Sequence, residues 1–131
     1  MPDIAKSGVP SISTVVPCPA HHISGLVAGE AIVAGDVCYI GSTGRVFRSI
    51  GTAANAAAKV DGMALQTAAI GEGISLYHDV NVRYGAALTP GARYYVGAAA
   101  GALADAATVG GTGPVAFAVD ATRIRVLVSR Y

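Results

Sequence analysis

Cysteine and histidine side chains that could do chemistry lie close together near the start of the sequence. Cys18, His21 and His22 fall within six residues, and the third histidine is His78. A thiolate beside an imidazole can act as a nucleophile with its base, and both groups bind zinc. A structural zinc site uses four ligands, however, and catalytic groups need a rigid surrounding shell. The proline-rich run around Cys18 offers neither, so we expect these residues to be polar parts of a surface segment.

Other residue patterns that accompany catalysis are missing from the sequence. There is no Gly-x-Ser-x-Gly motif, and the carboxylates are isolated, with Asp36 and Asp61 next to glycine in turn-like positions. The glycine-rich runs 71–73 and 110–113 are not followed by the helix and lysine that a phosphate-binding loop requires. We therefore predict that the protein is not an enzyme and uses no cofactor or metal.

The composition favours a protein whose surface is covered by a partner. Of the 131 residues, 53% are hydrophobic and only 13% are charged, with a formal net charge of +1. Soluble domains usually carry about 25% charged residues. No basic cluster is visible along the sequence, which argues against nucleic-acid binding.

The apolar runs are too short to span a membrane and no signal peptide is recognisable, so we expect synthesis in the cytoplasm and export only within an assembly. Cys18 and Cys38 are expected to be unpaired thiols.

Residues 1–25 predict an extended N-terminal arm. They contain four of the six prolines, which disfavour a helix or a central strand. The segment is nevertheless apolar at Ile4, Val9, Ile12, Val15 and Val16. One interpretation is an arm that binds a neighbouring molecule through these residues, and the other is a terminus that frays or packs on its own domain.

From Leu26 onward, short apolar runs separated by glycine turns predict a single all-β domain, residues 26–131. Val37–Ile40 and Arg45–Arg48 flank a glycine-containing loop and predict a β-hairpin. Residues 52–59 are alanine-rich and are compatible with one helical turn or a loop.

The second part of this domain repeats the first, giving pseudo-repeats 26–84 and 85–131. Gly35, Tyr39 and Gly41 correspond to Gly91, Tyr95 and Gly97, and Gly101-Ala-Leu103 takes the place of Gly44-Arg-Val46. Further on, we align Val115–Ala118 with Met63–Gln66 and Ile124–Val128 with Ile74–His78. Chance similarity in a sequence rich in glycine and alanine is the alternative. Two four-stranded units predict about eight strands, enough for a small β-barrel or sandwich.

Tyr94 and Tyr95 should face opposite sides of a strand. The alignment of Tyr95 with Tyr39 predicts that Tyr95 lies in the core and that Tyr94 is exposed, where it could contact a partner. The absence of tryptophan argues against a sugar-binding platform.

Motifs in the first repeat resemble those of small capsid decoration (cement) proteins of tailed bacteriophages. The residues concerned are 28–40, 44–48, 62–64 and 69–74, which match the order "AGE-I--GD--Y", a hairpin, "G-A" and "A--GE-I". The resemblance covers residues 26 to 84 and extends to the C-terminus through the repeat. It implies a β-tulip-like or barrel-like fold. It also implies a virion structural protein on the capsid exterior, with the major capsid protein and other copies of itself as partners, often as a trimer.

The resemblance implies no catalytic residues. Such a protein would stabilise the shell by bridging neighbouring capsid subunits, with the apolar arm adding a strand or lying in a groove. Phage head-fibre and tail modules share these turn and strand motifs. The alternative is therefore a module that binds a host surface or a glycan.

Overall fold

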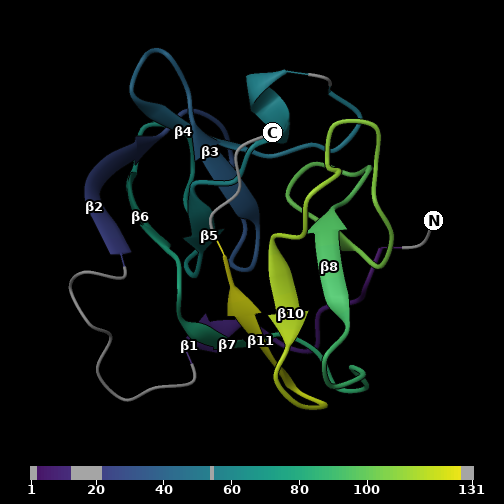
Figure 1. Cartoon of the computed structure of the whole chain (residues 1–131). Coiled ribbons are helices and arrows are strands. Elements are labelled where there is room, and N and C mark those ends of the chain that lie inside the picture. Colours follow the sequence, from purple (N-terminus) through teal and green to yellow (C-terminus); the bar gives the residue numbers. More distant parts are fainter. Residues whose placement is uncertain (1–2, 13–21, 54, 128–131) are drawn as a thin grey trace.

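The computed structural model describes residues 3–12, 22–53 and 55–127, and it is all-β, as predicted (Figure 1). Five strands form a closed barrel: β2 (His22–Ala28), β3 (Val37–Ile40), β4 (Arg45–Arg48), β5 (Gly62–Ala64) and β6 (Gly73–Tyr77). Six strands form a second sheet: β1 (Ser11–Ile12), β7 (Asn81–Arg83), β8 (Arg93–Val96), β9 (Leu103–Ala104), β10 (Ala116–Ala118) and β11 (Arg123–Val126). One 3-10 turn, η2 (Ala56–Ala58), lies in the alanine-rich run. No helix in the described part of the chain is long and apolar enough to cross a membrane.

The two sheets have the same strand pairing. The first has the order β4-β3-β5-β6-β2, and the second has β9-β8-β10-β11-β7 followed by β1. The structure thus divides into a first half, β2–β6, and a second half, β7–β11, each with five strands in the same order, one more than the sequence predicted. The strand β7 belongs to the second half, although residues 81–83 fall within the expected first repeat, 26–84. The additional strands are β2 and β7, and β2 begins at His22, inside the expected arm. Gly25, with a φ of +77°, lies where the β2–β6 register shifts, so this glycine marks a β-bulge rather than the end of the arm.

Equivalent hydrogen bonds establish the register of the repeat. Gly35 N–H donates to the carbonyl of Ala64 at 2.7 Å, and Gly91 N–H donates to that of Ala118 at 2.8 Å. Ala118 is therefore equivalent to Ala64, and Ile124, which pairs with Ala118, is equivalent to Leu76. The sequence alignment placed these later strands two residues away. A shift of two keeps every side chain on the same face, so the apolar pattern could not distinguish the two alignments.

The halves differ in how their sheets are completed. In the first, β2 pairs with β6 and also runs parallel to β4, which closes the barrel. In the second, residues 3–12 contact both ends of the sheet: Asp3 bridges to Ala104 of β9, and β1 pairs with β7. Residues 3–12 therefore complete the second sheet, whose other strands, β7–β11, come from the C-terminal half of the chain.

Two hydrophobic clusters fill the interior. The smaller lies inside the barrel and includes Ile32, Val46 and Leu76. The larger is built mainly from the second half but also contains Val37, Val60 and Met63 of the first. The two halves therefore share a core.

Candidate functional site

Residues 3–12, here called the N-terminal segment, are attached to the body through a few specific contacts. Ile4 N–H donates to the carbonyl of Leu103 at 2.9 Å, and Ser7 N–H donates to that of Tyr84 at 3.0 Å. Lys6 Nζ lies 3.4 Å from Asp36 Oδ1, and the Asp36 side chain is almost fully buried. Of the two interpretations offered for residues 1–25, these ten residues follow the self-packed one.

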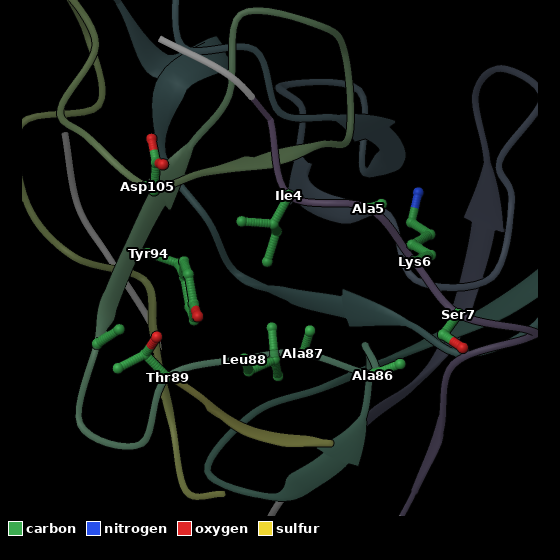
Figure 2. Close-up of a pocket in the computed structure, with 11 residues that line it drawn as sticks. Ile4, Ala5, Lys6, Ser7, Ala86, Ala87, Leu88, Thr89, Tyr94 and Asp105 are labelled. Atoms are coloured by element: carbon green, nitrogen blue, oxygen red, sulfur yellow. The ribbon is translucent and has the colours of Figure 1, made fainter. Parts of the chain in front are cut away.

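A cavity of about 550 Å³ lies between this segment and the second sheet. Figure 2 shows Ile4 and Leu88 reaching toward it from opposite sides, with the Tyr94 ring beside them. The other polar residues that line it are Lys6, Ser7, Thr89 and Asp105. Apolar walls with a few polar atoms are typical of a site that accepts a ligand group or a partner's side chain.

Tyr94 is not exposed, contrary to the sequence prediction. It is 4% exposed, whereas Tyr95, which the sequence predicted in the core, is half-buried. The reason is that the second sheet packs its Tyr94 face against the N-terminal segment and the 86–89 loop. Burial raises the pKa of the Tyr94 phenol. Tyr94 can thus contact a partner only through the cavity.

The other residues predicted to bind a partner are dispersed. Ile4 packs against the larger core and lines the cavity, while Val9 is 74% exposed. Ile12 pairs with Val82 in the β1–β7 ladder. Val15 and Val16 lie outside the described residues. The structure therefore brings together Ile4 and Tyr94 and leaves Val9 on the surface.

The residues considered for metal or nucleophilic chemistry form no metal-binding group as far as they are described. Cys18 and His21 lie outside the described residues. His22 belongs to β2 and stacks on Tyr77 with ring centroids 5.5 Å apart, and His78 Nδ1 lies 3.1 Å from Asp79. Within residues 3–12, 22–53 and 55–127, no three histidine, cysteine or acidic side chains are grouped to hold a metal ion.

Cys38 is buried in the barrel, and its thiol donates to the carbonyl of Asp36 at 3.4 Å. Burial, together with the Asp36 carboxylate, raises the pKa of this thiol. The nucleophilic thiolate is therefore strongly disfavoured at neutral pH.

Sequence reasoning missed the cavity residues Leu88, Thr89 and Asp105. The repeat contained one signal for Leu88 and Thr89, because residues 85–92 precede β8 as residues 29–36 precede β3.

No family model, curated protein or solved structure matches this chain.

Proposed function

We propose that the protein is a capsid decoration protein, which binds the outer surface of an assembled viral shell and stabilises it by bridging neighbouring subunits. The motif resemblance to phage decoration proteins and the low charge of the chain support this proposal. Repeated copies, each burying on the order of 1,000 Å² or more, would favour the intact shell by mass action.

The observation that carries the proposal is the position of β1. Among the strands that the structure describes, β1 lies at the edge of the second sheet and pairs with β7 alone. An edge strand offers unpaired backbone N–H and C=O groups to a strand from another chain. The sequence continues beyond Ile12 with Thr14, Val15 and Val16, residue types that favour strands. Together with the exposed Val9, this edge is the surface through which we propose that the capsid is bound.

Reconstitution on bare capsids of the encoding bacteriophage tests the proposal. The purified protein should bind them at a fixed stoichiometry and raise the temperature at which the shells disassemble. Val9→Asp should weaken binding, because it places a charge in the apolar contact, while Val109→Asp provides a control of similar exposure, 78%, outside the proposed surface. Absence of saturable binding by the unmodified protein would refute the proposed function.

A host-surface or glycan-binding module is the second candidate, and one observation favours it. The β3–β4 hairpin carries Tyr39 and Phe47, with ring centroids 5.9 Å apart, beside a hollow of about 670 Å³. Ser42, Thr43 and Asn55 also line this hollow. Aromatic rings next to hydroxyl and amide groups suit a saccharide. Binding to a glycan array that is abolished by Tyr39→Ala, with no capsid binding, would favour this candidate.

A further inference from the structure

Arginine residues that are dispersed along the sequence lie together on the outward face of the second sheet. Four of the nine basic residues lie on β7, β11 and β8, which are separated along the chain; in the sheet β7 and β11 are neighbours, and β10 lies between β11 and β8 (Figure 1). They are Arg83, Arg93, Arg123 and Arg125, and with Phe117 of β10 they are called the arginine face.

Strand register shows that these side chains share one side of the sheet. Phe117 pairs with Arg93 on one neighbour and with Arg125 on the other. One step along the strands, Arg123 pairs with Arg83. The residues that alternate with them, including Tyr94, Ala116 and Ile124, are buried. Since adjacent strands lie about 4.8 Å apart, Arg93 and Arg125 start about 10 Å apart on either side of the ring.

Three of the four arginines have no carboxylate partner in the part of the chain that the structure describes, although Arg125 donates a hydrogen bond to Asn81 Oδ1 at 3.4 Å. Arg123 Nε lies 2.7 Å from Asp120 Oδ2, and that pair is satisfied. No carboxylate among residues 3–12, 22–53 and 55–127 forms an ion pair with Arg83, Arg93 or Arg125. Arg123 and Arg83 also stand directly opposite each other, an arrangement that destabilises a sheet. An anionic partner would relieve this repulsion.

An apolar hollow accompanies the charges. A pocket of about 390 Å³ is lined by Arg93, Phe117, Pro114 and Leu127 among others, and the Phe117 side chain is 37% exposed. Guanidinium groups bind carboxylates in a two-pronged geometry, and the hollow suits an aliphatic side chain between them. A single-stranded nucleic acid would instead favour several exposed aromatic rings and a broad positive surface, whereas this protein has a net charge of only +1.

We propose that the arginine face docks a partner polypeptide segment that alternates acidic and aliphatic side chains, with its carboxylates on Arg93, Arg125 and Arg83 and one aliphatic side chain beside Phe117. The inference rests on the proposed function and deepens it, since it specifies the chemistry of a surface on the capsid partner.

Fluorescence anisotropy with a labelled peptide of alternating Glu and Leu tests the inference, with the Gln-for-Glu peptide and a thymidine oligonucleotide of similar length as alternative probes. The Glu peptide should bind and weaken as salt is raised, while the other two should bind more weakly or not at all. Arg93→Gln and Arg125→Gln should each weaken binding roughly threefold to tenfold. Arg45→Gln is the matched control, because Arg45 is exposed and begins β4 as Arg93 begins β8.

Thermal unfolding of each variant verifies that it is folded. Equal binding by all three arginine variants, no preference for the Glu peptide over the Gln peptide, or tighter binding of the oligonucleotide would each overturn the inference.

Capsid binding by the same variants distinguishes failure of this inference from failure of the proposed function. If the unmodified protein binds capsids and the Arg93 and Arg125 variants bind equally well, the proposed function stands and this inference fails. If the unmodified protein does not bind capsids, the proposed function fails.

Discussion

Gly35 and Gly91 occupy equivalent turns in the two halves, but their surroundings differ. Both have positive φ angles, +96° and +84°, which L-residues with a Cβ rarely adopt. A Cβ on Gly91 would meet open space, whereas one on Gly35 would lie 2.7 Å from Pro10 Cγ and 2.9 Å from Lys6 Cε. The Gly35 turn is therefore a docking point for the N-terminal segment.

Substituting alanine for each of the two glycines should distinguish the energetic cost of backbone strain from the cost of disturbing the contact with the N-terminal segment. Gly91→Ala should cost about 1–2 kcal/mol of stability from strain alone. Gly35→Ala should cost roughly 1–3 kcal/mol more, because Pro10 and Lys6 must move. Urea denaturation of both variants measures the difference, and equal losses would show that the segment does not press on this turn.

Asp120 provides a second prediction at the scale of one residue. Hydrogen bonds from the Thr122 backbone N–H and from Arg123 lower the pKa of this carboxyl from 3.8 to about 2. A lowered pKa contributes stability that is complete above about pH 4 and is lost as the pH falls through about 2. NMR titration of the Asp120 carboxyl should give a midpoint near 2, and Arg123→Gln should move it upward. Arg125→Gln should leave it unchanged, and a similar shift in both variants would contradict the assignment.

At the scale of elements, the N-terminal segment combines a buried anchor with an exposed surface. Ile4 packs against the larger core, while Val9 is 74% exposed. Ile4→Ala should therefore lower the free energy of unfolding by roughly 1–2 kcal/mol, less than for a fully buried isoleucine. Val9→Ala should change it by no more than about 0.5 kcal/mol. Chemical denaturation compares the two, and comparable losses would mean that Val9 is also buried in solution.

The elements also show what the sequence could predict. The β3–β4 hairpin was recognisable because Gly44 marks its turn, and the same signal at Gly101 located β8–β9. β2 was missed because Gly25 looked like a break. The arginine face could not be predicted, because its residues lie on strands that are far apart in the sequence, such as β7 and β11. Only the register of strand pairing places their side chains next to one another. A turn can be predicted from a few neighbouring residues, whereas the cavity and the arginine face depend on pairing between strands that are distant in the sequence.

At the scale of the whole molecule, the shared core should make folding cooperative. Val37 and Met63 belong to the first half but are buried with residues of the second. The barrel alone would expose them to water, so a fragment containing only residues 22–80 should not fold stably. For the full chain, unfolding followed by circular dichroism and by tyrosine fluorescence should give coincident transitions. Two separated transitions would indicate independent halves.

The closure of the second sheet by residues 3–12 also has a consequence for the order of events on the ribosome. Asp3 is synthesised about a hundred residues before its bridge partner Ala104. At about 5–20 residues per second, the delay is on the order of ten seconds. Throughout that time the segment has no completed second sheet to bind. It therefore reaches its native position only after the strands of the second half have been made.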